Sequence, residues 1–165
     1  MIQEPTPIRP PDVEAEQHVL AAVDRLLAVR PGECLACYLQ RMVHEHGCTE
    51  HRFVTAYRDR AAPRATALRA RLERLGGFCD CEVLLNAYVT VAELEAEARL
   101  DARRRRAVER DDDDAYDEAQ EQLDALDREA MRLEPQPCAG VRGGSTQPCT
   151  RWRTYRVDRR MRYGW

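Results

Sequence analysis

Residues 76–88 read GGFCDCEVLLNAY and place two cysteines one residue apart, between a glycine pair and an aliphatic run. The glycines allow the chain to turn tightly, so that backbone N–H groups can face the two sulfurs. A CxC knuckle of this kind is typical of half a metal site, because zinc favours four thiolate or imidazole ligands in a tetrahedron. The stretch therefore raises the question of where the remaining ligands lie.

A second knuckle, Cys34-x-x-Cys37, occurs in the stretch GECLACYLQRMVHEHGC. Its second cysteine is expected to begin a helix, whose positive end favours the thiolate. We predict a structural zinc ion bound by two pairs, which are Cys34 with Cys37 and Cys79 with Cys81. Cys48 is an alternative to Cys34 as the fourth ligand, because it closely follows the same helix.

Cys138 and Cys149 form a looser pair in a glycine-rich C-terminal stretch. They fit a partial second metal site, a disulfide formed on exposure to oxidant, or two inert thiols. A chain without metal also stays open, because free cysteines often act as small buried hydrophobic residues and a CxxC can be a redox pair. His44 and His46 lie near the first knuckle as possible ligands, although exposed helix positions are the simpler interpretation.

Apolar spacing predicts a mainly α-helical fold, a small zinc-clipped helical domain followed by a long charged helix or helical hairpin and a basic loop-like tail. Helices are expected at about 12–29, from the first knuckle to about Gly47, at about 50–60, and from Pro63 to about Leu75. Thr90 and Glu93 form a capping-box pattern that opens the charged region. The run RRRRAVERDDDD lacks an apolar seam, so it either bridges one long helix or forms the turn of a hairpin.

Composition divides the chain into four parts: a proline-rich N-terminus expected to be disordered, a cysteine-rich zinc-binding helical domain, an acidic helical arm and a basic tail. Their bounds are 1–11, 12–89, 90–134 and 135–165. Residues 91–134 hold 8 arginines and 16 acidic residues, whereas residues 135–165 hold 7 arginines and one acidic residue. These two segments either pair with each other or present the tail to an acidic partner.

The net charge of −3 gives no bulk electrostatic case for nucleic-acid binding. No segment approaches the roughly 20 apolar residues of a membrane span, and the N-terminus lacks the pattern of a signal peptide. We therefore expect a cytoplasmic protein without a membrane partner. In a reducing compartment, seven cysteines favour metal binding or thiol chemistry over disulfides.

Two segments are candidates for partner contacts. The end of the chain, RWRTYRVDRRMRYGW, mixes arginines that suit phosphates with aromatic residues that stack on bases. The candidate contacts to a protein or nucleic acid are Arg151, Trp152, Arg153, Tyr155 and Arg156. The alternative is a tail docked on the acidic helices, with its aromatic residues packed against the domain. Apolar residues within 116–133 form a short heptad seam that suits a homodimer. They are Tyr116, Ala119, Leu123, Leu126, Ala130 and Leu133.

The stretches GECLACYLQRMVHEHGC, FVTAYRDRAAPRATALRARLERL and GGFCDCEVLLN together resemble a family of small bacterial proteins, catalogued as domain of unknown function 2695. The resemblance covers about Glu33 to Val89. It implies a shared fold and a shared metal site presenting the cysteines at positions 34, 37, 48, 79 and 81. It implies no reaction, because the family carries no established activity.

The leading hypothesis is a non-enzymatic, zinc-stabilised binding or regulatory module. The sequence contains no GxSxG, HExxH or GxGxxG motif, and its GVRGGST stretch lacks the lysine of a phosphate-binding loop. Asp80, Glu82 and Asn86 bracket the CxC, where helix capping or support of the sulfurs is favoured over general-base catalysis. The alternative is a thiol-redox or metal-dependent enzyme, which needs a thiol of depressed pKa or a metal with an open position.

Overall fold

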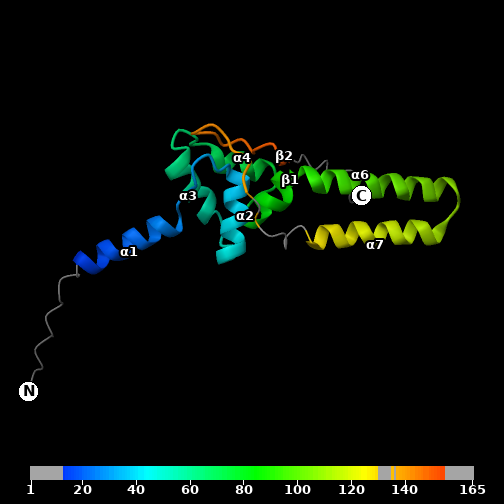
Figure 1. Cartoon of the computed structure of the whole chain (residues 1–165), viewed down its shortest axis with the longest axis horizontal. Coiled ribbons are helices and arrows are strands. Elements are labelled where there is room, and N and C mark those ends of the chain that lie inside the picture. Colours follow the sequence, from blue (N-terminus) through cyan, green and yellow to red (C-terminus); the bar gives the residue numbers. More distant parts are fainter. Residues whose placement is uncertain (1–12, 130–134, 136, 155–165) are drawn as a thin grey trace, which may run out of the picture.

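The computed structural model describes residues 13–129, 135 and 137–154. Its helices are α1 (Val13–Leu26), α2 (Leu35–His46), α3 (Arg52–Ala61), α4 (Leu68–Arg74), α5 (Asp80–Glu82), the π-helical turn η1 (Val83–Ala87), α6 (Val91–Glu109) and α7 (Asp113–Glu129). Two short strands are β1 (Tyr88–Thr90) and β2 (Trp152–Thr154). The predicted mainly α class is confirmed. In Figure 1, α1 extends from one side of a central body and the α6–α7 hairpin from the other.

Helix α2 lies at the centre of the body, where its residues 35–42 are all buried. Tyr38 of α2 packs at a tilt against Tyr57 of α3, with ring centroids 5.5 Å apart. The other large, fully buried side chains come from α2, α3, α4 and η1, and include Leu35, Leu39, Met42, Phe53, Leu68, Leu72 and Val83. Aliphatic side chains thus make up most of the core around this aromatic pair.

A buried ion pair fixes the chain just before α2. The guanidinium of Arg41 donates through Nε and Nη2 to the two carboxylate oxygens of Glu33, at 3.0 and 2.9 Å. Arg41 also donates to the carbonyl of Ala28, at 3.0 Å. The hydrogen bonds to Glu33 raise the pKa of Arg41 above its ordinary value. Because Glu33 immediately precedes Cys34, this ion pair fixes the position of the chain at the start of the first knuckle.

The C-terminal segment is loop-like up to β2 and returns to the body. Strands β1 and β2 pair antiparallel, with Thr90 opposite Trp152, and the N–H of Val91 donates to the carbonyl of Arg151 at 2.8 Å. Trp152 and Cys149 are 4% and 3% exposed. Residues 137–151 are loop-like, as predicted, and only Trp152–Thr154 form a strand. Apolar side chains of this segment also complete the core. Residues 155–165 lie outside the described part, as does the predicted disorder of residues 1–11.

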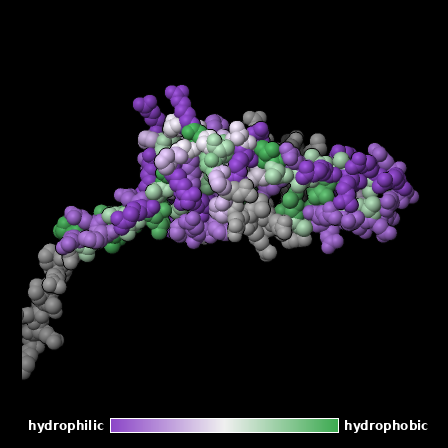
Figure 2. Space-filling model, in the orientation of Figure 1, coloured by the Kyte–Doolittle hydropathy of each residue, from purple (hydrophilic) through white to green (hydrophobic). Residues whose placement is uncertain are grey.

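The acidic region folds as a hairpin, which decides between the two predicted forms. Thr90 and Glu93 form the predicted capping box at the start of α6. The chain reverses between α6 and α7, where Asp111 adopts a φ of 54°. Ala107 and Ala119 are both 0% exposed, because their small side chains let α6 and α7 approach closely. Figure 2 shows a largely hydrophilic outer surface on this hairpin.

Some residues of the predicted heptad seam are buried or half-buried within the chain itself. Ala119 is buried and Leu123 and Leu126 are half-buried, whereas Ala130 and Leu133 lie outside the described residues. Arg103 of α6 donates to Gln122 and Glu118 of α7, at 2.9 and 3.3 Å. These contacts hold α7 against α6. The homodimer through residues 116–133 stays a prediction.

The largest difference from the predicted helix boundaries is at the start of the fourth helix. The fourth helix begins at Leu68 and not at Pro63. Residues 62–68 instead form consecutive tight turns, in which Ala65 donates to the carbonyl of Ala62 at 2.9 Å and Leu68 to that of Ala65 at 3.0 Å. Within the described residues, none of the helices has the length and apolar character needed to cross a bilayer.

Gly77 provides a test of the packing before the CxC. A β-carbon at this position would lie 2.7 Å from Val83 Cγ2 and 3.0 Å from Val83 Cα. Gly77→Ala is expected to lower the free energy of unfolding by about 1–3 kcal/mol, because it overpacks a rigid contact. Gly143→Ala is the matched control, since a β-carbon there meets nothing within 4 Å. Urea denaturation of both variants measures the difference, and equal stabilities would contradict this packing.

Candidate metal centre

The seven cysteines fall into two groups whose sulfurs are close enough to hold a metal ion. We call Cys34, Cys37, Cys138 and Cys149 the cysteine quartet, and Cys48, Cys79 and Cys81 the cysteine trio. Within each group, all Sγ atoms lie within 4.8 Å of one another. No cysteine is shared between the groups, so the chain contains two separate candidate sites.

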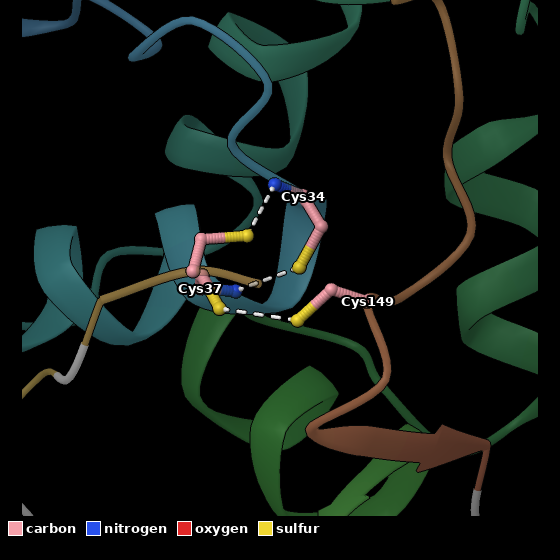
Figure 3. A group of neighbouring side chains, drawn as sticks. Cys34, Cys37 and Cys149 are labelled. Carbon is pink, nitrogen blue, oxygen red and sulfur yellow. Dashed lines mark hydrogen bonds between the residues drawn. The ribbon is translucent and has the colours of Figure 1, made fainter. Parts of the chain in front are cut away.

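The quartet joins the start of α2 to the C-terminal segment. In Figure 3, Cys34 and Cys37 come from the first turn of α2, and the Cys149 side chain points toward them from the loop before β2. Cys34 Sγ accepts the N–H of Cys37 at 3.5 Å, and Cys37 Sγ lies 3.8 Å from Cys149 Sγ. Cys138 enters from the other end of the returning segment, and its Sγ accepts the N–H of Cys34 at 3.3 Å. Two segments far apart in sequence thus converge on one point.

Several hydrogen bonds place the returning segment over α2. The N–H of Val141 donates to the carbonyl of Gly32 at 2.8 Å, next to the first knuckle. The hydroxyl of Tyr57 lies within hydrogen-bond distance of the carbonyls of Glu33 and Ser145, at 3.1 and 2.9 Å. The N–H of Trp152 donates to the carbonyl of Cys149 at 3.0 Å. The position of Cys138 and Cys149 is therefore fixed by backbone contacts on both sides of the quartet.

Hydrogen-bond donors surround the quartet sulfurs. The indole Nε1 of Trp152 donates to Cys37 Sγ at 3.2 Å, and the N–H of Gly140 donates to Cys138 Sγ at 3.3 Å. Such donors stabilise the negative charge of a thiolate and orient it toward a bound ion. Cys34, Cys37 and Cys149 are at most 4% exposed, while Cys138 is half-buried. The surroundings therefore suit thiolates that bind an ion within the body.

The thiols of the quartet bind protons unequally. The interaction with Cys37 lowers the pKa of Cys34 to about 5, and the same interaction raises the pKa of Cys37. Burial raises the pKa of Cys138. Each ionised thiol makes the next harder to ionise, and a bound cation removes that penalty. Four thiolates side by side thus fit a metal ion.

The trio lies where the loop after α2 meets the CxC. Cys79 Sγ and Cys81 Sγ are 3.1 Å apart, and Cys48 Sγ accepts the N–H of Cys81 at 3.3 Å. Cys79 is the N-cap of α5, and its sulfur accepts the N–H of Glu82 at 3.4 Å. All three cysteines are half-buried. Burial is the main cause of a raised pKa at Cys81.

Asp80, between the two cysteines of the CxC, anchors the trio to the core. Its carboxylate oxygens accept the N–H groups of Phe53 and Val54, at 2.8 and 2.9 Å. These N–H groups belong to the first turn of α3 and have no partner within that helix, so Asp80 caps α3 from a distant part of the chain. Its own N–H donates to the carbonyl of Glu50 at 2.6 Å, in the loop that carries Cys48. Asp80 therefore holds both halves of the trio together.

The predicted pairing of the two knuckles differs from the structure. Cys34 and Cys37 do not group with Cys79 and Cys81, because α2 places the first knuckle at its N-terminus and Cys48 beyond its C-terminus. Cys48 groups with the CxC, as the alternative ligand set supposed, but without Cys37. Cys138 and Cys149 supply the second half of the first site. The prediction that Cys138 and Cys149 form a partial metal site therefore agrees with the geometry.

The other predicted site residues have structural contacts. Glu82 accepts the N–H of Phe78 at 2.9 Å, and Asn86 donates to the carbonyl of Gly76 at 2.7 Å. His44 and His46 are exposed, and among the described residues no histidine joins either cysteine group. His51 is buried, with Nε2 at 2.9 Å from the carbonyl of Gly77. These contacts agree with capping and support of the knuckles.

The predicted partner contacts of the C-terminus are only partly described. Trp152 packs in the core, so its ring is not available to stack on a base, which agrees with the alternative that aromatic residues of the tail pack against the domain. Arg151 donates to the carbonyl of Pro137 at 3.1 Å and is half-buried, whereas Arg153 is exposed. Tyr155 and Arg156 lie outside the described residues.

The segment from the start of α2 to η1 is similar in sequence to a known family. Residues 35–86 match the family model DUF2695, described as a protein of unknown function. The predicted resemblance is thereby confirmed for this segment, which contains the whole trio but of the quartet only Cys37. Neither a curated protein nor a solved structure gives a significant match. The α6–α7 hairpin, Cys138 and Cys149 lie outside the matched segment.

The role of Asp80 leads to a stability prediction. Asp80→Asn keeps one oxygen acceptor but turns an amide donor toward an N–H of α3, so one buried N–H loses its partner. We expect the free energy of unfolding to fall by about 1–3 kcal/mol. Asp59→Asn is the control, because Asp59 is exposed and pairs with Arg58, a contact worth less than about 1 kcal/mol. Chemical denaturation of both variants tests this, and an unchanged Asp80→Asn protein would refute the capping role.

Proposed function

We propose that this chain is a non-enzymatic binding module whose core is stabilised by a zinc ion bound to the cysteine quartet. The observation that carries the proposal is the convergence of four thiols, three of them nearly inaccessible, within 4.8 Å of one another. Four protein thiolates around one zinc ion fill its coordination shell, which is typical of structural sites. Such a zinc ion would link the helical domain of residues 12–89 to the returning C-terminal segment.

The donor set favours zinc among the common metals. Four thiolates select zinc or iron over calcium and magnesium, which prefer oxygen ligands. Sulfurs at about 2.3 Å from a tetrahedral zinc lie about 3.8 Å apart, and the Cys37 and Cys149 sulfurs are already at 3.8 Å. Iron in the same site would give a coloured, redox-active protein, so metal analysis separates the two.

Binding is favoured over catalysis because the quartet leaves no coordination position open for a substrate. A metal-dependent enzyme needs such a position. A thiol-redox enzyme needs an accessible low-pKa thiol, whereas Cys34 is 0% exposed. The alternative of a thiol-redox or metal-dependent enzyme would therefore have to use the trio.

The uneven charge of the chain indicates an acidic partner. Residues 155–165 carry four arginines, Arg156, Arg159, Arg160 and Arg162, and a single acidic residue. Arginine suits phosphate and carboxylate groups through paired N–H donors. The partner we propose is a nucleic acid or an acidic protein surface, and the competing ligand is the acidic α6–α7 hairpin of the chain itself.

Replacing a quartet cysteine tests the zinc proposal. Cys149→Ser is expected to lose one zinc ion per chain, because serine is a poor zinc ligand. The returning segment then loses its link to α2, and a loss of about 3 kcal/mol would lower the unfolding midpoint by about 10 °C for a chain of this size. Zinc analysis by mass spectrometry and thermal unfolding measure both effects. Ser145→Ala, in the same loop, is the control.

A Cys149→Ser protein with unchanged zinc content and unchanged midpoint would contradict the proposal. Iron instead of zinc in the freshly purified chain would contradict the identity of the metal. Cys138→Ser provides a second variant at a half-buried ligand, should Cys149→Ser fail to fold. Its expected result is the same loss of zinc.

Removing residues 155–165 tests the partner proposal. The deletion leaves β2 and the quartet in place, unlike a deletion from residue 151. Fluorescence anisotropy with a single-stranded oligonucleotide of about 20 nucleotides, and with an acidic peptide, should show binding by the full chain that weakens steeply with salt. The truncated chain should lose it. A full-chain variant with lysine at the four arginine positions is the control that keeps the charge.

Intact binding after the truncation would exclude residues 155–165 as the contact. Absence of binding by the full chain to both probes, at low salt, would contradict the acidic-partner proposal. Binding that appears only after the hairpin acids are neutralised would show that the tail pairs with the chain itself. The zinc proposal is independent of all three outcomes.

A further inference from the structure

The cysteine trio is a second group of soft ligands that the proposed structural zinc does not use. Its sulfurs lie within 4.8 Å of one another and share no residue with the quartet. We propose that Cys48, Cys79 and Cys81 bind a second thiophilic metal ion through three thiolates, with a fourth coordination position open to an external ligand. This inference does not depend on the zinc proposed for the quartet.

The backbone prepares the three sulfurs to share one ion. Cys48 Sγ accepts the N–H of Cys81 at 3.3 Å, and Cys79 Sγ accepts the N–H of Glu82 at 3.4 Å. Donors of this kind support thiolates in metal sites. The Cys79 and Cys81 sulfurs, 3.1 Å apart, need to separate by only about 0.7 Å to reach the spacing in a tetrahedral zinc shell.

The anchoring of the CxC gives the site its rigidity. Asp80 places both of its carboxylate oxygens on N–H groups of α3, so it is not available as a ligand. Its N–H donates a hydrogen bond to the carbonyl of Glu50, two residues after Cys48, at 2.6 Å. The loop carrying Cys48 and the turn carrying the CxC are thus joined independently of any ion.

The fourth ligand is missing from the described residues around the trio. No histidine or carboxylate oxygen among them joins the group. Two potential ligands close in sequence to the trio have other contacts: Glu82 accepts the N–H of Phe78, and His51 Nε2 lies 2.9 Å from the carbonyl of Gly77. All three cysteines are half-buried, in contrast to Cys34, Cys37 and Cys149 of the quartet. An ion held there keeps one side accessible.

The ligands define the class of ion and what the site can do. Thiolates select soft or borderline ions, such as Zn²⁺, Cd²⁺ and Cu⁺, over Mg²⁺ and Ca²⁺. Three protein ligands with an open position differ from a closed structural site, because the fourth ligand can be exchanged. The external ligand is water, a small thiol or imidazole, or a side chain of a partner.

The test is a metal titration of the full chain, freed of metal under reductant and then loaded with Co²⁺. We expect the unmodified chain to bind two equivalents, one for each cysteine group. Cys79→Ser and Cys48→Ser should each lose one of the two equivalents and keep the other. Thr49→Ser, next to Cys48, is the control and should keep both. Circular dichroism of each variant shows whether it remains folded.

The open position has its own spectroscopic signature. Added imidazole should shift the visible bands of the two-equivalent protein and leave those of Cys79→Ser unchanged, because the quartet has no free position. One equivalent in the unmodified chain that survives Cys79→Ser would overturn the second site and leave the quartet proposal intact. A Cys79–Cys81 disulfide formed under reductant would also overturn it. Two equivalents without any response to imidazole would overturn the open position.

Discussion

The convergence of the cysteine quartet is the constraint on which the rest of the fold depends. Cys34 and Cys138 are 104 residues apart, and Cys37 and Cys149 are 112 apart. Closing so long a loop costs chain entropy, and the metal ion that we propose for the quartet would offset that cost by holding both ends. With the returning segment held, Trp152 fills the core and β2 pairs with β1. The α6–α7 hairpin projects from the body, and in the sequence it lies between the two halves of the quartet.

The CxC has a second structural role that explains its spacing. The single residue between the cysteines, Asp80, turns inward and caps α3, while the sulfurs on either side turn toward Cys48. This spacing places one carboxylate in the core and keeps the two sulfurs together beside Cys48. Asp80 therefore links the stability of the helical body to the geometry of the trio, and the same residues carry both packing and chemistry.

The helices and the cysteine pairs were predictable from the sequence, whereas the partners of the pairs were not. Apolar spacing and the Thr90–Glu93 capping box are local signals, and they located α2, α3 and α6 to within a few residues. Which knuckle meets which depends on contacts across the whole chain. The length of α2 separates Cys37 from Cys48, and strand pairing carries Cys149 to Cys37. The available signal was that Cys48 joins the CxC to make a group of three, which leaves the helix-start pair and the C-terminal pair to complete each other.

Zinc-edge X-ray absorption on a chain lacking the trio thiols tests the central claim most directly. In a Cys48→Ser, Cys79→Ser and Cys81→Ser triple variant, the only thiols left are those of the quartet. The account predicts one zinc ion per chain with four sulfur ligands at about 2.3 Å. A shell containing nitrogen or oxygen, or a folded protein without zinc, would contradict the claim that the quartet closes the fold around a structural ion.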